Sequence, residues 1–112
     1  MFGKISISRE NMSLLGALLN QENIRNRKMI EEYEKELATL PKGSIKIKTI
    51  GHNSYYYLVY RDGKKIISKY IGKDAAGLAA IKEQLDKRHH IELMLKHLKQ
   101  EQQQIKKMEA ML

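Results

Sequence analysis

Residues 42–73 read KGSIKIKTIGHNSYYYLVYRDGKKIISKYIGK, and this stretch decides the fold. Isoleucine and lysine alternate at 45–48, and the residues at 55–61 are mainly aromatic or β-branched. This pattern is typical of strands, and the glycines and polar residues between the segments are typical of tight turns. We therefore predict a three-stranded antiparallel β-meander over residues 42–73, with its third strand ending at Gly72.

The dipeptide Asp62-Gly63 predicts how the second and third strands pair. It is a preferred centre of a two-residue type I′ hairpin turn. The pairs expected from this turn are Arg61 with Lys64, Val59 with Ile66, Tyr57 with Ser68 and Tyr55 with Tyr70. The opposite face is then expected to carry Tyr56, Leu58, Tyr60, Lys65, Ile67, Lys69 and Ile71. Gly51-His52-Asn53 supplies the turn between the first two strands.

Before the predicted sheet, residues 8–40 show helical spacing of apolar residues. The helix is expected to start near the stretch Ser8 to Asn11 and to end before Pro41, because the residue before a proline is pushed out of the α region. Between Leu19 and Met29 the only apolar residue is Ile24. We therefore expect a polar interruption or a helix break within residues 20–28.

After the predicted sheet, residues 74–112 are expected to form one long helix with Asp74 as its N-cap. Such a helix spans about 57 Å at 1.5 Å per residue and needs a partner along that length. The apolar spacing from Ile91 onward favours antiparallel, coiled-coil-like pairing with the first helix, dimerisation, or both. Gln102-Gln103-Gln104 is interpreted as an exposed polar run. The fold class is thus α+β, in a single domain of residues 1–112.

Composition limits the classes of protein that fit. The 112 residues are 42 % hydrophobic and 30 % charged, which is typical of a small folded domain. The absence of cysteine excludes disulfides and thiolate metal sites. Neither a membrane-spanning apolar run nor the apolar core of a signal peptide is found, so a soluble cytoplasmic protein is expected.

Positive charge is concentrated in the predicted sheet. Residues 42–73 contain eight lysines and arginines and one acid, whereas the formal net charge of the whole chain is +8. Residues 1–41 are neutral and residues 74–112 have a net charge of +1. Charge gathered on one structural element favours a polyanionic partner over a charge that only keeps the protein in solution.

The residues predicted to bind nucleic acid lie on all three predicted strands: Lys46, Lys48, Tyr55, Tyr57, Arg61, Lys64, Lys65 and Lys69. Lysine and arginine neutralise phosphates, and tyrosines either pack in a groove or stack on bases. The alternative for the same residues is that the tyrosines are core and the lysines protect sheet edges. Edge protection does not require nearly all of the net charge to lie on three strands, so binding is favoured. The choice between DNA and RNA and the face left free stay open.

The sequence SYYYLVYRDGKK at 54–65, followed by SKYIGK at 68–73, resembles small uncharacterised bacterial and phage proteins that carry a YYYLxYRxGxK…SKYIG signature. It is more loosely similar to the amino-terminal arm-binding domains of tyrosine recombinases and to the N-terminal hairpins of some transposases. In the arm-binding domains a three-stranded sheet backed by one helix contacts the DNA major groove. That resemblance implies DNA contact through the sheet. The long helix before the sheet and the lack of a catalytic domain after it depart from the recombinase pattern.

Catalysis is not predicted. No two of the four histidines stand four residues apart, as a pair that chelates a metal on one helical face would. No glycine-rich phosphate loop precedes a helix, so we expect no catalytic residue, metal, cofactor or small-molecule substrate. Two alternatives to a nucleic-acid-binding protein stay open. One is a phage-encoded inhibitor of the anti-CRISPR type, which binds a nuclease effector or its nucleic-acid-bound guide complex. The other is a helical assembly protein that forms a homodimer through its long helices.

Overall fold

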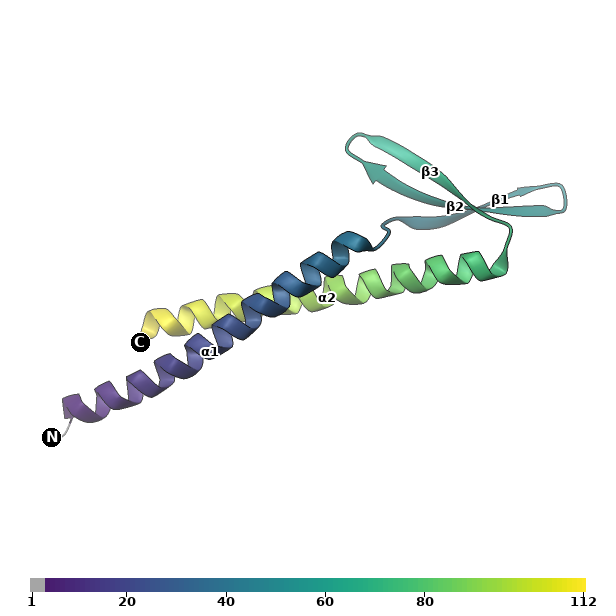
Figure 1. The fold of residues 1–112 in the computed structure, drawn as a ribbon. Helices are drawn as coiled ribbons and strands as arrows, with labels where there is room; N and C mark the ends of the chain where they lie inside the picture. The colour runs from purple at the N-terminus through teal and green to yellow at the C-terminus, as the bar shows by residue number, and fades with distance from the viewer. Residues whose placement is uncertain (1–3) are drawn as a thin grey trace. The chain divides into compact units, whose positions relative to one another are not determined.

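The computed structural model describes the backbone of residues 4–112 and the side chains of residues 14–112. Its elements are α1 (Lys4–Thr39), β1 (Ser44–Ile50), β2 (Asn53–Asp62), β3 (Lys65–Gly72) and α2 (Ala75–Met111) (Figure 1). The predicted α+β order of helix, three-stranded sheet and long helix is confirmed. The chain divides into a helical unit, Met1–Lys35 with Leu93–Leu112, and a sheet unit, Glu36–Glu92. That these act as one domain stays a prediction.

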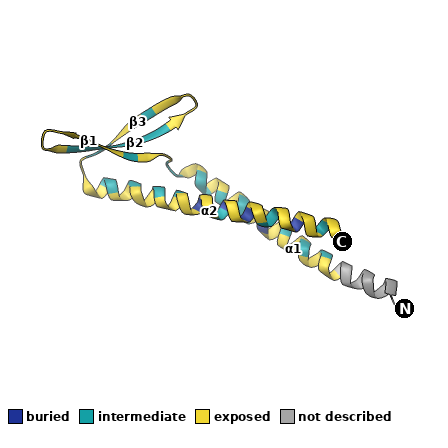
Figure 2. Cartoon of the chain, turned by 180° about the vertical axis from the view of Figure 1, so that it is seen from behind, coloured by how far each residue is buried: buried dark blue, intermediate teal, exposed yellow. Residues whose placement is uncertain are grey.

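In the helical unit, α1 and α2 pack against each other in opposite directions, as predicted. Asn26 Nδ2 donates a hydrogen bond of 3.0 Å to the Leu98 carbonyl, and Gln102 Nε2 donates one of 2.8 Å to Asn23 Oδ1. The apolar side chains buried here are Leu95, Leu98 and Ile105 (Figure 2). Their spacing along α2 matches the helical repeat of the sequence.

The helix α1 is continuous through residues 20–28, so the helix break considered for this stretch is wrong and the polar interruption is confirmed. Asn23 and Asn26 interrupt the apolar stripe but face α2, where both make hydrogen bonds. The partner of Asn23 is Gln102, which is therefore half-buried and not exposed as expected; Gln103 and Gln104 are exposed. A polar layer thus lies inside the helix pair.

The predicted bounds of α1 hold at its end but not at its start. The helix ends at Thr39, before Pro41, as predicted. It begins at Lys4, earlier than the predicted start near Ser8. The side chains of the predicted start, Ser8 to Asn11, lie outside the described residues.

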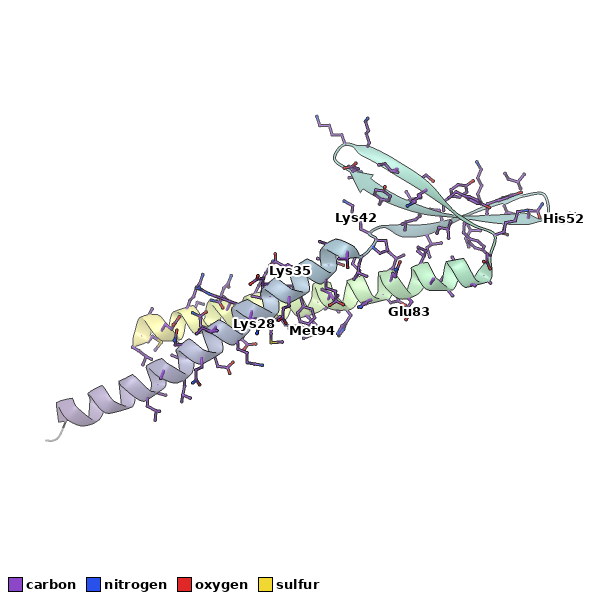
Figure 3. All side chains as sticks on the ribbon, viewed as in Figure 1. Lys28, Lys35, Lys42, His52, Glu83 and Met94 are labelled. Atoms are coloured by element: carbon purple, nitrogen blue, oxygen red, sulfur yellow. The ribbon has the colours of Figure 1, made fainter. Side chains whose placement is uncertain are left out.

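In the sheet unit the strands pair in the order β1-β2-β3, all antiparallel. Two-residue turns, Gly51-His52 and Gly63-Lys64, connect them, and His52 lies at the tip of the first hairpin (Figure 3). Each turn places a glycine with φ of 62° first, as a type II′ turn requires. The predicted type I′ turn at Asp62-Gly63 is wrong because it needs positive φ at Asp62, and no non-glycine residue in the described part has one.

The new turn shifts the pairing of β2 with β3 by two residues from the predicted register. Arg61 pairs with Ile66, Val59 with Ser68, and Tyr57 with Tyr70. Because side chains alternate with a period of two, a shift of two changes every partner but leaves each residue on its predicted face. The predicted composition of the two sheet faces is therefore correct although the predicted pairs are not.

Helical segments of the sheet unit cover part of one face of the sheet, around Leu58, while Ile47 on the same face is 64 % exposed. Leu58 is only 6 % exposed and lines a cavity together with Lys69, Ile71, Leu40, which follows α1, and Ile81 of α2. This face, called the covered face below, also carries Ile45, Ile47, Tyr56, Tyr60, Asp62, Lys65 and Ile67.

Within the sheet unit, side chains cap the C-terminal end of α1 and the N-terminal end of α2. Arg88 Nη1 donates hydrogen bonds of 3.1 Å to the carbonyls of Leu37 and Leu40, where α1 runs out of its own donors. At the start of α2 the predicted N-cap is confirmed, because Asp74 Oδ1 accepts a bond of 3.0 Å from Ala76 N.

An exposed ion pair also joins the two helices of the sheet unit. Lys87 Nζ lies 2.8 Å from Glu36 Oε1, and this hydrogen-bonded contact raises the pKa of Lys87 above its ordinary value of 10.5.

Candidate nucleic-acid interface

The face of the sheet opposite Leu58 is called the open face. Its side chains are given by the strand pairing: Ser44, Lys46, Lys48, Ile50, Asn53, Tyr55, Tyr57, Val59, Arg61, Ile66, Ser68 and Tyr70. All of them are exposed or half-buried, and Figure 2 shows few buried positions on the strands. Ile66 is 68 % exposed, so none of the described elements packs tightly on this end of the face.

Three tyrosines form the centre of the open face. Tyr70 lies directly opposite Tyr57, with ring centroids 5.4 Å apart, and diagonally from Tyr55, with centroids 6.3 Å apart. The rings are tilted by 53° and 47°, within the range of geometries that aromatic pairs favour. The cluster comes from two strands, so the pairing of the second hairpin holds it together.

Cationic side chains surround the tyrosine cluster. On β1, Lys46 lies opposite Tyr57 and Lys48 lies opposite Tyr55, and both lysines are exposed. Arg61 stands on the same face near the second turn. No acidic side chain among the described strand residues shares this face, because Asp62 pairs with Lys65 on the other side. The open face therefore carries uncompensated positive charge beside aromatic rings.

The structure brings together five of the eight predicted binding residues. Lys46, Lys48, Tyr55, Tyr57 and Arg61 all lie on the open face. Lys64 is an exposed residue of the second turn, at the edge of both faces. The remaining two predicted residues lie on the covered face.

Lys65 and Lys69 are those two residues. Lys65 pairs with Asp62 and Lys69 pairs with Leu58, so the strand alternation directs both side chains away from the open face. Lys69 lines the cavity between sheet and helices. Both residues lie on the face predicted for them, so they do not share one surface with Lys46 and Lys48.

Tyr70 and Lys73, which were not among the predicted binding residues, add an aromatic ring and a cation to the open face. Tyr70 was predictable, since strict alternation from Arg61 already placed it on this side of the sheet. Lys73 was not, because alternation along β3 places it with Lys69 on the covered face. An extra residue in β3, between the pairs Tyr57–Tyr70 and Tyr56–Gly72, reverses that alternation. The ammonium of Lys73 accordingly lies 4.9 Å from the centre of the Tyr55 ring.

The side chains of the open face are suited to contact with an anion. Lysine and arginine supply charged donors, and the tyrosines supply apolar surface and hydroxyl groups. Within residues 14–112, no group of three His, Asp or Glu side chains is placed to hold a metal ion. The two described helices lack a segment long and apolar enough to span a bilayer.

The comparisons with known proteins concern the same part of the chain. Neither the curated proteins nor the solved structures include a match. The family model described as a domain of unknown function, DUF6788, matches residues 20–90, a range that includes the whole sheet and every residue of the open face. Because this match covers more than half of the 112 residues, the chain belongs to the DUF6788 family.

Proposed function

We propose that this protein binds nucleic acid through the open face of its sheet and catalyses no reaction. The observation that carries the proposal is the joint placement of Lys46, Lys48 and Arg61 with the tyrosine cluster on one face whose described strand residues include no acid. A phosphate backbone binds such a face by releasing its condensed counterions as lysines and arginines neutralise it. Tyrosine adds contact with sugars and base edges.

Concentration of the charge supports the same proposal. The strands and turns of residues 42–73 carry nearly all of the net charge of +8. Uncompensated cations repel one another when they stand on one small surface, so such a cluster lowers stability unless an anion binds there. If the lysines only prevented pairing of the sheet edges with another chain, glutamates on the same strands could balance their charge without loss of that protection.

The salt dependence of binding tests this proposal. Fluorescence anisotropy with a labelled 20-base-pair DNA is measured over a series of salt concentrations. Affinity of the wild-type protein is expected to fall steeply with salt. Arg61→Ala combined with Lys64→Ala is expected to reduce the slope of log affinity against log salt by about 2 if each cation meets one phosphate.

The matched control is Lys106→Ala combined with Lys107→Ala, which removes the same charge from exposed positions of the helical unit. This variant is expected to keep the wild-type slope. An unchanged slope for the Arg61 and Lys64 variant, or equal loss in the control, contradicts the proposal. Absence of binding at low salt to DNA and to RNA contradicts it entirely.

We also propose that the helical unit forms a homodimer. An apolar cleft at one end of this unit is lined by Leu15, Leu18, Leu19, Glu22, Met108, Met111 and Leu112. Leu18 is 50 % exposed and Met111 is 83 % exposed. The cleft continues the seam that buries Ile105, and a second copy offers an identical apolar end to cover it in a closed two-fold contact.

Light scattering after size exclusion tests the homodimer. The wild-type protein is expected at twice the 13.0 kDa of one chain. Leu18→Glu with Met111→Glu is expected to elute as a monomer because two carboxylates desolvate poorly in an apolar contact. Lys106→Gln, an exposed change nearby, is expected to remain dimeric. A wild-type mass of one chain contradicts the homodimer.

A further inference from the structure

The cavity of the sheet unit lies between the covered face of the sheet, the end of α1 and the first part of α2. Its volume is about 560 Å³, within the range of roughly 300–1,000 Å³ typical of sites that bind small molecules. The apolar residues that line it include Leu40, Leu58, Ile71 and Ile81. Of these only Leu58 is buried, and the other three are half-buried. The apolar surface left uncovered around this cavity favours an apolar occupant over water.

Gly77 keeps space free in this cavity. It is the third residue of α2, and it lines the cavity. A Cβ atom built on it would meet no atom within 4 Å outside its own helical turn, and its φ is not positive. Neither close packing nor backbone conformation therefore requires glycine here, and glycine forms helices less readily than alanine. The missing side chain leaves room beside the apolar wall.

Lys69 supplies a cation to the same cavity. It lies opposite Leu58 on the neighbouring strand, and it is exposed although it lines the cavity. A lysine in such a place covers apolar surface with its stem and keeps its ammonium in water at the rim. None of the ion pairs formed among residues 14–112 includes Lys69, and none of the described residues that line the cavity is acidic. The cavity thus combines an apolar wall with a cation that no acid neutralises.

We propose that this cavity binds a small amphipathic anion, a molecule with an apolar chain or ring and a single carboxylate group. The apolar part covers Leu40, Ile71 and Ile81 and displaces water from them, while the carboxylate pairs with the Lys69 ammonium at the rim. The site is separate from the open face, because strand alternation directs Lys69 to the opposite side of the sheet. The proposal therefore does not depend on nucleic-acid binding.

Two-dimensional 1H–15N NMR of the whole protein locates and measures this binding. The probes are decanoate, decanol and decylammonium, which share one apolar chain and differ in charge. Decanoate is expected to shift the amide signals of Lys69, Ile71 and Gly77 in a saturable manner and to bind about threefold or more tightly than decanol. The order is informative, because an alcohol leaves water more readily than a carboxylate and would bind better to a cavity that recognised only the chain.

Substitutions in the cavity make the test specific. Lys69→Met keeps an apolar stem and removes the charge, so decanoate is expected to bind about threefold or more weakly while decanol binds as before. Lys65→Met is the matched control, because Lys65 lies on the same face of β3 but does not line the cavity. This control is expected to bind decanoate like the wild type. Gly77→Leu, checked for folding by circular dichroism, is expected to weaken decanoate binding by about tenfold because its side chain fills the space.

Several results would overturn the proposal. Absence of saturable shifts in the sheet unit, or shifts confined to the cleft at Leu18 and Met111, would show that the cavity is not a site. Decanol or decylammonium that bound as tightly as decanoate would exclude recognition of the anion, as would equal losses in Lys69→Met and Lys65→Met. Unchanged affinity of folded Gly77→Leu would place the ligand outside the cavity. The proposed nucleic-acid binding stands or falls by its own salt series.

Discussion

Gly43 shows how strongly one residue limits the fold of the sheet unit. It follows the end of α1 with φ of 120°, a conformation that side chains rarely adopt. A Cβ atom at this position would overlap the carbonyl oxygen of Val59 and lie 2.9 Å from the Cβ of Tyr60. The backbone entering β1 therefore runs too close to β2 for any side chain.

Gly43→Ala is accordingly expected to lower the free energy of unfolding by about 3 kcal/mol or more, because positive φ and backbone overlap add. Gly51→Ala is the matched control, since its φ is also positive but nothing lies within 4 Å of the added atom. That variant is expected to lose about 1–2 kcal/mol. Urea denaturation measures both. Equal losses of unfolding free energy in the two variants would show that the close approach of Gly43 to β2 does not add to the cost of the substitution.

Asn26 is a fully buried polar residue of the helical unit. Its side chain is 1 % exposed, its Nδ2 is bonded to the Leu98 carbonyl, and its Oδ1 has no hydrogen-bond partner among the described residues. A hydrogen bond within an apolar seam favours one register of the two helices, while the unpaired oxygen lowers stability. Asparagine here gives specificity more than stability.

Asn26→Asp is expected to destabilise the protein by about 3 kcal/mol or more at pH 7, because it buries a carboxylate beside a carbonyl oxygen. Burial raises the pKa of such a carboxyl group, so the folded variant takes up a proton as the pH falls toward 4 and can then donate it to the Leu98 carbonyl. The deficit relative to wild type should therefore shrink at low pH. Asn26→Leu is expected to be at least as stable as wild type. Urea denaturation at pH 7 and pH 4 would contradict this if Asn26→Asp matched wild type at both.

Asn23 and Asn26 also show what a local pattern leaves open. A polar gap in an apolar stripe is compatible with a break, a bulge or a polar layer. The residue that decides among them, Leu98, lies 72 positions away in the sequence. The sequence around residues 20–28 could therefore not show that the helix is continuous, because the contact between Asn26 and Leu98 lies outside it.

At the scale of elements, the end of α1 depends on a side chain from α2. Arg88 donates to the carbonyls of Leu37 and Leu40, and its side chain is only 21 % exposed. The sequence around Pro41 predicted where the helix ends but did not identify what satisfies its last carbonyls. Such a cap links the two helices within the sheet unit.

Arg88→Met is expected to reduce the free energy of unfolding by about 1–2 kcal/mol, because two charge-assisted hydrogen bonds are lost while the methionine keeps most of the apolar packing. Lys87→Met is the control, since it removes an exposed ion pair to Glu36 one position away and is expected to lose less. Thermal unfolding of both variants gives the comparison. A larger loss for Lys87→Met would exclude the cap as a stabilising contact.

The hairpin elements show which parts of a sheet are predictable. Strand positions and the two faces followed from alternation, and they were correct. The turn type was not, because Asp62-Gly63 and Gly63-Lys64 are both good two-residue turns and only the pairing of whole strands selects one. The same holds for the extra residue before Gly72, which moves Lys73 to the open face. Register details of this kind depend on contacts between strands.

At the scale of the whole molecule, the sequence predicted the order of elements and the antiparallel helix pairing, because both follow from long local patterns. It did not predict which sheet face stays open. That depends on packing of Leu58 beside Leu40, just after α1, and Ile81 of α2, about 20 residues away along the chain in either direction. Five of eight predicted binding residues proved to share the open face, since the period of two groups them without knowledge of the helices.

The most direct test of the proposed function compares equal charge changes on the two faces. Lys46→Ala with Lys48→Ala removes two cations from the open face, and Lys65→Ala with Lys69→Ala removes two from the covered face. Duplex binding is measured at 150 mM salt and above, where exposed charges are screened beyond about 8 Å. The open-face variant is expected to lose affinity and to lower the salt slope by about 2, while the covered-face variant stays close to wild type. Equal losses in both variants, or a larger loss on the covered face, would contradict binding through the open face.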